Sequence, residues 1–213
     1  MSGDVEQAYR GGLTFEAYRA RMRVHLHAFN DLYERLAFVR EHAAGKAPLG
    51  ACRILILTED YCIDSVLNVP LIAHLAEATP DAELRIASRD MYAGLARCFP
   101  GRGDMSRLPT VIFLRRSMQV LGYWSERSKS DHAWMATFQA RHPIPALTLD
   151  NGQPRGAPVD WMARRLASQR PFFESQSWRD VRNELHAIAS ADSPTDRLTP
   201  ASPVALASIN END

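Results

Sequence analysis

The chain has 213 residues, of which 46% are hydrophobic and 23% are charged, a composition typical of a globular protein with a sizeable core. Its 25 basic residues are balanced by 25 acidic residues, which argues against nucleic acid and against an anionic membrane surface as partners. No apolar run approaches the roughly 20 residues of a membrane-spanning helix, and the first residues lack the apolar core of an export signal. We therefore expect no membrane partner.

The N-terminal segment is predicted to be helical. Residues 1–12 look like an irregular lead-in that ends in two glycines. From Thr14, which is suited to an N-cap, apolar residues recur at steps of three and four, and Gly45 is a suitable stop. This pattern predicts one long helix whose apolar stripe packs on a sheet.

The next elements follow the order β-α-β-α-β-β-α, in which a helix connects two parallel strands and a hairpin closes the sheet. Apolar runs and alternation indicate the strands, and apolar spacing of three and four residues indicates the helices. In chain order they are expected at 52–57, 64–79, 83–87, 89–99, 109–114, 120–124 and 130–141. Pro70 lies inside the second of these and is expected to kink that helix.

The C-terminal third has a weaker pattern. Residues 142–158 hold four prolines and predict an irregular connection, after which short helices are expected near 158–169 and 178–189. Ser177 and Asp180 have the spacing of a capping signature for the last helix. We therefore divide the chain into an N-terminal helical extension, an α/β core, a linker with a helical extension, and a flexible tail, at 1–49, 50–142, 143–189 and 190–213.

The three cysteines, Cys52, Cys62 and Cys98, are too few and too widely spaced for a disulfide framework, so we expect a cytoplasmic protein. There is no CxxC pair on which to build a zinc site. His25 and His27 face different directions on a helix and do not form a ligand pair. We expect no metal.

The stretch from Thr58 to Pro70, TEDYCIDSVLNVP, places Cys62 between a strand and a helix. The first N–H groups of a helix favour a thiolate, so this position suits a reactive cysteine. The segment EDYCIDS resembles the EDWCGDC type of bacterial thioredoxin-like protein. Tyr61, Ile63 and Ser65 stand where that type has Trp, Gly and a second Cys.

Three further markers have the order and spacing of the thioredoxin-like superfamily. Pro70 follows Ser65 by five residues, as the kink proline of the active-site helix does in thioredoxin. Leu108-Pro109-Thr110 resembles the cis-proline segment that lies against the active-site cysteine, and Gly122 lies where the last strand commonly has a glycine. The resemblance implies a thioredoxin fold, an α/β structure with a mixed sheet of about four strands between helices.

The sequence departs from thioredoxin at two linked positions. Ser65 replaces the resolving cysteine, and Ile56 replaces the buried aspartate that shuttles a proton to it. With both groups missing, the resemblance implies a monothiol CxxS site rather than a dithiol reductase.

The sequence leaves the reactivity of Cys62 open. The helix N-terminus lowers its pKa, whereas the neighbouring charges of Glu59, Asp60 and Asp64 raise it. The alternative to a nucleophile is an inherited cysteine without a role.

Supporting roles are open in the same way. Ser65 could donate a hydrogen bond to the Cys62 sulfur or be a plain first-turn residue, and Asp64 could carry a proton or be a solvated carboxylate. Cys98 could be a resolving thiol or a buried structural cysteine. Pro109, if cis, would present the backbone of Leu108 to a substrate, as the resemblance implies. The residues expected to bind substrate are Tyr61, Ile63, Leu108 and Pro109.

Our first hypothesis is a monothiol thiol–disulfide exchange protein that acts through Cys62, supported by Ser65 and Asp64. Its expected partners are proteins or low-molecular-weight thiols held in mixed disulfides, and it needs no cofactor except an external small thiol as co-substrate. The alternative is a non-catalytic thioredoxin-fold module that binds a protein or peptide in the same groove. A glutathione transferase is a third reading, disfavoured because such enzymes end in a large helical domain.

Overall fold

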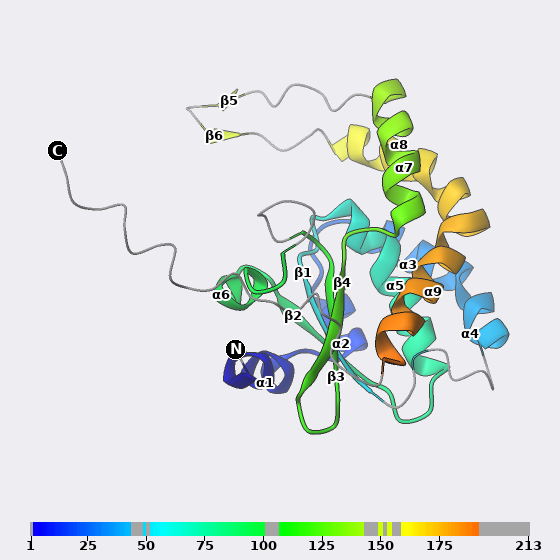
Figure 1. The fold of residues 1–213 in the computed structure, drawn as a ribbon. Helices are drawn as coiled ribbons and strands as arrows, with labels where there is room; N and C mark the ends of the chain where they lie inside the picture. The colour runs from blue at the N-terminus through cyan, green and yellow to red at the C-terminus, as the bar shows by residue number, and fades with distance from the viewer. Residues whose placement is uncertain are drawn as a thin grey trace, which may run out of the picture.

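A four-stranded mixed sheet lies at the centre of the molecule, with the strand order β2-β1-β3-β4 (Figure 1). The computed structural model describes residues 2–43, 49, 52–100, 107–142, 149–150, 153–154 and 159–191. The strands are β1 (Arg53–Thr58), β2 (Glu83–Ser88), β3 (Thr110–Leu114) and β4 (Val120–Ser125). β1 pairs in parallel with β2 and antiparallel with β3, and β3 and β4 form an antiparallel hairpin. The predicted α/β fold is confirmed.

The central strand β1 is buried on both faces of the sheet. Ile54 and Ile56 pack into one hydrophobic cluster, and Leu55 and Leu57 pack into a second cluster on the opposite face. Because successive side chains of a strand point to opposite faces, a continuous apolar run such as this one needs helices on both sides.

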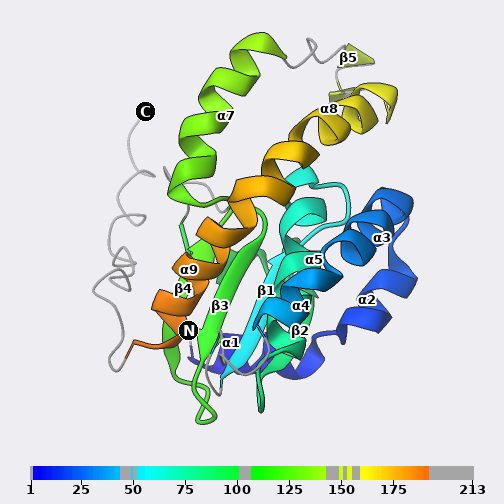
Figure 2. The same ribbon diagram turned by 90° about the vertical axis from the view of Figure 1, so that its right-hand side faces the viewer.

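One face is covered by a layer of helices in which α5 lies directly on the sheet, with α4 and α9 beside it (Figure 2). α5 continues through Pro70 and carries Cys62 at its N-terminus. Trp178, Val181 and Leu185 of α9 are buried in the same cluster, so the C-terminal helix is part of the core. These helices are α3 (Leu26–Arg35), α4 (Ala37–Ala43), α5 (Ile63–Glu77) and α9 (Trp178–Ala189).

The opposite face is covered by α1 (Ser2–Gly11) and α6 (Ala93–Ala96) (Figure 1). The expectation of an irregular lead-in was therefore wrong. Val5, Ala8 and Tyr9 form a short apolar stripe that packs on the sheet, which explains why this segment is helical. The predicted helix at 89–99 was too long, since only α6 is helical there.

The prediction of one long N-terminal helix was also wrong, because the segment forms three helices, α2 (Phe15–Arg21), α3 and α4. The prediction of Thr14 as N-cap is confirmed, since its hydroxyl accepts the Ala17 N–H at 3.2 Å. Beyond α2, the N–H groups of Arg23 and Val24 donate to the Asp60 carboxylate at 2.7 and 3.2 Å. They are then not available to carbonyl groups one turn earlier, which interrupts the helix.

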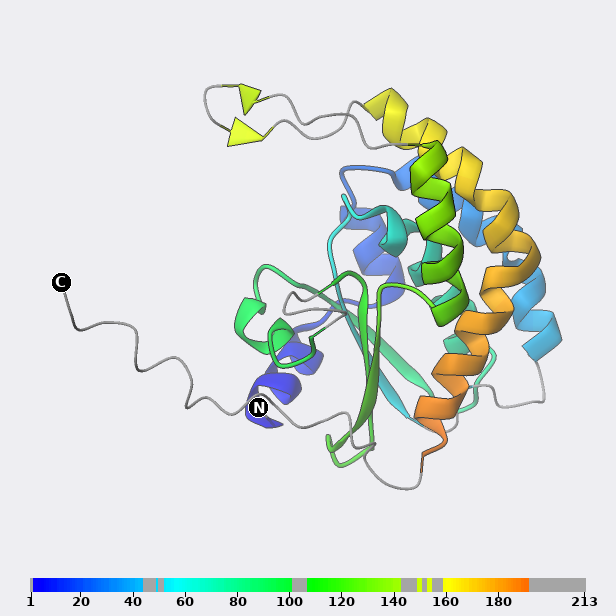
Figure 3. The ribbon, with the colours of Figure 1, turned by 45° about the horizontal axis from the view of Figure 1, so that its top comes forward.

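The C-terminal third forms α7, followed by the run of α8, η1 and α9 along one side of the molecule (Figure 3). Ser177 is not an N-cap as predicted. It has helical dihedral angles, and its hydroxyl donates to the buried Asp131 carboxylate at 2.8 Å. The elements are α7 (Lys129–Arg141), β5 (Leu149–Asp150), β6 (Gln153–Pro154), α8 (Val159–Phe172) and the π-helix η1 (Phe173–Ser177).

The connection expected to be irregular contains the small hairpin of β5 and β6. Most of that connection, and the tail expected from residue 190, lie outside the described residues.

Candidate functional site

Cys62 is the N-cap residue of α5, reached by a short loop from the end of β1. Its thiol is partly buried and donates to the Leu108 carbonyl at 3.6 Å. The peptide bond between Leu108 and Pro109 is cis. The structure thus brings Cys62 together with Leu108 and Pro109, although Cys62 lies 46 residues before Leu108 in the chain.

The Cys62 sulfur is surrounded by groups that have opposite effects on its pKa. The Ser65 hydroxyl and the N–H groups of Asp64 and Ser65 stabilise the thiolate, and Thr58 Oγ1 donates to Ser65 Oγ at 2.6 Å, which leaves the Ser65 proton for the sulfur. Burial, first, and the charge of Asp64, second, outweigh these groups and raise the pKa of the Cys62 thiol. At neutral pH the resting form is therefore the protonated thiol.

Glu59 and Asp60 fix the loop between β1 and α5. Glu59 Oε1 accepts from Ser88 Oγ at 2.6 Å and from the Asp90 N–H at 2.9 Å, which ties the loop to the end of β2. Asp60 ties the same loop to the segment between α2 and α3 through Arg23 and Val24. From the sequence we expected the charges of Glu59, Asp60 and Asp64 to raise the pKa of Cys62, whereas the carboxylates of Glu59 and Asp60 anchor backbone and hydroxyl donors.

Asp64 is not the solvated carboxylate that we weighed as one alternative. Only 13% of its side chain is exposed, and both of its oxygens accept from Arg127, with Nε at 2.8 Å from Oδ1. Burial raises the pKa of Asp64 to about 6, although the Arg127 charge lowers it. At neutral pH this carboxylate is ionised, and it therefore opposes ionisation of Cys62.

This geometry agrees with the sequence comparisons. Residues 12–139 match the family model described as Thioredoxin, more than half of the 213 residues. The chain belongs to the thioredoxin family. No curated protein sequence matches it.

Two solved structures share the fold of this thioredoxin-family protein. A protein of unknown function from Pseudomonas aeruginosa is 18% identical, with a TM-score of 0.54 over 86% of this chain and 95% of that chain. An HIV epitope-scaffold is 17% identical, with a TM-score of 0.52 over 78% of this chain and 97% of that chain. At these identities, the similarity concerns the fold alone.

Three residues of this thioredoxin-family site were missed by the sequence reasoning. The Glu126 N–H donates to the Pro109 carbonyl at 2.9 Å, and Arg127 Nη1 donates to Glu126 Oε1 at 2.7 Å. Asn68 Nδ2 donates to the carbonyls of Asp64 and Glu126, at 2.9 and 3.3 Å. These bonds join the first turn of α5, the loop after β4 and the cis-proline loop. The available signal was a charged pair, Glu126-Arg127, directly after the last strand.

The remaining predicted residues lie at different depths. Tyr61 is 47% exposed beside Cys62, and its hydroxyl accepts from Arg89 Nη2 at 2.8 Å, whereas Ile63 packs against the core. Cys98 donates to the Gly94 carbonyl one turn earlier and packs in the cluster under α1. The contacts described for Cys62 do not include Cys98, and its role as a resolving thiol stays a prediction.

Within the described ranges, no group of three His, Cys, Asp or Glu side chains is placed to hold a metal ion. Across the same ranges, the structure has no helix that is both long enough and apolar enough to cross a bilayer.

Proposed function

We propose that this protein carries out monothiol thiol–disulfide exchange through Cys62. The observation that supports the proposal is the contact of the Cys62 sulfur with the carbonyl before cis-Pro109, at the N-terminus of α5. One turn further along the helix, Ser65 offers a hydroxyl in place of a second thiol, so an adduct on Cys62 has no internal thiol at this position to displace it.

The exchange proceeds in two steps. The Cys62 thiolate attacks one sulfur of a mixed disulfide R–S–S–R′, the S–S bond breaks, and R′S⁻ leaves and takes up a proton while Cys62–S–S–R forms. An external low-molecular-weight thiolate then attacks the sulfur of R, and the Cys62 thiolate leaves as the new disulfide departs. The substrates are mixed disulfides that contain a protein thiol or a small thiol.

The raised pKa of the Cys62 thiol affects the rate of each step. A thiol with a raised pKa is a stronger nucleophile once ionised, but it is a poorer leaving group. Attack by Cys62 is slow at neutral pH because only a small fraction of the thiol is ionised. The adduct on Cys62 is released slowly because the Cys62 thiolate is a poor leaving group. These properties suit a protein that holds one adduct until a small thiol releases it.

A second candidate is a binding module that holds a peptide in the same groove without covalent chemistry. The raised pKa of the Cys62 thiol, which keeps it protonated at neutral pH, favours this alternative. Tyr61 and Met91, which are 47% and 80% exposed, follow the ends of β1 and β2 and offer apolar surface there.

Alkylation and adduct formation across pH distinguish the two functions. The reduced protein is treated with iodoacetamide, and separately with a small disulfide, from neutral pH to about pH 10, and each cysteine is followed by mass spectrometry. We expect one mixed disulfide that is lost in Cys62→Ser and kept in Cys98→Ser, since Cys98 is the other partly buried thiol. If Cys62 forms no adduct over this range and a peptide binds Cys62→Ser as well as wild type, the binding module is the correct function.

A further inference from the structure

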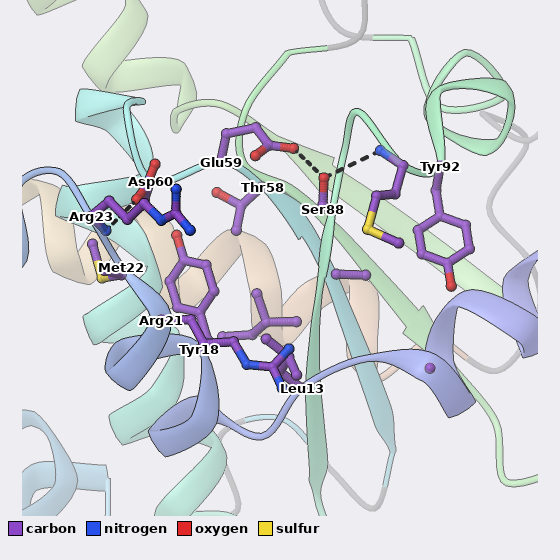
Figure 4. A pocket seen from close by; sticks show the side chains of 14 residues that line it. Leu13, Tyr18, Arg21, Met22, Arg23, Thr58, Glu59, Asp60, Ser88 and Tyr92 are labelled. Atoms are coloured by element: carbon purple, nitrogen blue, oxygen red, sulfur yellow. Dashed lines mark hydrogen bonds between the residues drawn. The ribbon is translucent and has the colours of Figure 1, made fainter.

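A cleft of about 390 Å³ opens where β1 and β2 end (Figure 4). The N-terminal segment between Gly11 and Arg23 forms one wall, and residues 58–60 and 86–92 form the other. Its volume is within the range of about 300–1,000 Å³ found for small-molecule sites. Cys62 does not line it, so the cleft is distinct from the contact between Cys62 and Leu108.

Two positive and two negative side chains line this cleft, and the Asp60 carboxylate lies beside the backbone of Arg23 (Figure 4). Arg21 and Arg23 come from the N-terminal wall and are exposed, and neither guanidinium forms an ion pair with another described residue. Glu59 and Asp60 come from the loop before Cys62. In each carboxylate one oxygen accepts the anchoring hydrogen bonds, which fixes the group while its second oxygen has no bond to the described residues.

Tyr18 adds a buried hydroxyl whose approach to Thr58 is not a hydrogen bond of normal geometry. Its ring stands between Arg21 and Arg23, and its hydroxyl points toward Thr58 and Asp60 (Figure 4). A buried hydroxyl that is only partly satisfied is costly, so a bound molecule that offers it a well-placed polar atom gains free energy.

We propose that this cleft binds a small zwitterion, an amino acid or a short peptide. Its carboxylate lies with Arg21 and Arg23, and its ammonium group lies with Glu59 and Asp60. The four charges of the cleft sum to zero, so a simple anion or cation meets two repulsive groups, whereas a zwitterion pairs with all four. The apolar lining, which includes Leu13, Met22 and Met91, accommodates the side chain.

Thr58 lines the cleft and donates to Ser65 Oγ at 2.6 Å, and the Ser65 hydroxyl in turn lies against the Cys62 sulfur. The zwitterion is then the amino-acid part of the external thiol that releases the adduct from Cys62. This last assignment rests on the proposed function, whereas binding of the zwitterion does not.

The first experiment measures binding to wild type by titration calorimetry with glycyl-L-methionine, which cannot form a disulfide. N-acetyl and C-terminal amide forms remove one charge each, and free L-methionine separates an amino-acid site from a peptide site. We expect both blocked forms to bind at least about tenfold more weakly, the loss of one charge-assisted contact. Equal affinities of charged and blocked forms, or no binding of any zwitterion at millimolar concentration, overturns the proposal.

The second experiment locates the site. The double variant Arg21→Gln, Arg23→Gln should weaken binding about tenfold or more, whereas Arg19→Gln, on the same helix as Arg21, should not, because Arg19 lies over the Tyr33 ring outside the cleft. Cys62→Ser should bind as wild type does. Failure of adduct formation at Cys62 leaves this binding intact, so the two proposals fail separately. If adducts form but cysteinylglycine releases them no faster than its N-acetyl amide, the assignment to the external thiol is wrong.

Discussion

Asp64 and Arg127 form a two-point ion pair across 63 residues of sequence, between the first turn of α5 and the loop after β4. Their side chains are only 13% and 14% exposed. Arg127 also binds Glu126, whose N–H donates to Pro109. The carboxylate whose charge raises the pKa of Cys62 is therefore positioned by the same network that holds the cis-proline loop.

Asp64→Asn should make Cys62 more reactive. The Asp64 charge is the second-largest cause of the raised Cys62 pKa, and a neighbouring charge contributes about 1 kcal/mol, or roughly a fivefold higher thiolate fraction at neutral pH. The measurement is the rate of iodoacetamide alkylation of Cys62 against pH. Asp60→Asn is the matched control, because that carboxylate is committed to backbone donors of Arg23 and Val24 and should leave the rate unchanged. Equal rates for Asp64→Asn and wild type would contradict the role given to Asp64.

Asp64 should also produce a pH-dependent loss of stability. Its pKa is about 6 in the folded protein and about 4 in an unfolded chain, so the folded state binds the extra proton between these values. The contribution of Asp64 to the free energy of unfolding thus falls as pH rises from about 4 to about 6. Urea denaturation of wild type and Asp64→Asn at both ends of this range gives the free energy of unfolding of each protein. We expect the stability of Asp64→Asn relative to wild type to increase from about pH 4 to about pH 6. A difference that is constant with pH would show that Asp64 has an ordinary pKa.

The central strands were predictable from local patterns in the sequence, whereas the approach of Cys62 to the Pro109 segment was expected only from the resemblance to the thioredoxin-like superfamily. The apolar run of β1 identifies a doubly covered strand, and its connection to α5 places Cys62 at a helix N-terminus. These features depend on neighbours in the chain. The pairing with Arg127 depends on contacts that no local pattern encodes.

The N-terminal helices show the same limit. Apolar spacing continues past Arg21, so periodicity alone predicts one helix, but the Asp60 carboxylate takes the N–H groups of Arg23 and Val24 and the chain turns. Ser177 has the spacing of an N-cap, but Asp131 of α7 accepts its hydroxyl proton. In both places a buried or anchoring carboxylate from another element decided the local structure.

Tyr18→Phe should not destabilise the protein, and should stabilise it by up to about 1 kcal/mol, because the variant removes a buried hydroxyl whose approach to Thr58 is not a hydrogen bond of normal geometry. Tyr33→Phe is the matched comparison on the neighbouring helix. Its hydroxyl donates to Glu77 at 2.7 Å, so its loss should cost about 0.5–1.5 kcal/mol. Urea denaturation of both variants gives the two values. A loss for Tyr18→Phe as large as for Tyr33→Phe would mean that the Tyr18 hydroxyl already has a partner.

Ser65→Cys should restore a disulfide but not an efficient reductase. Ser65 is 1% exposed one turn after Cys62, where the thioredoxin family commonly has its second cysteine, so mild oxidation should join the new thiol to Cys62. A buried thiol needs a proton acceptor to become a nucleophile, and the fully buried residue six positions before Cys62 is Ile56. We therefore expect the mass of the oxidised variant to fall by two hydrogens, while reduction of insulin with dithiothreitol stays close to the uncatalysed rate. Ser65→Ala, which cannot form the disulfide, is the control for packing. Rapid insulin reduction by Ser65→Cys alone would show that the missing thiol, and not the apolar residue beneath it, is what separates this site from a dithiol reductase.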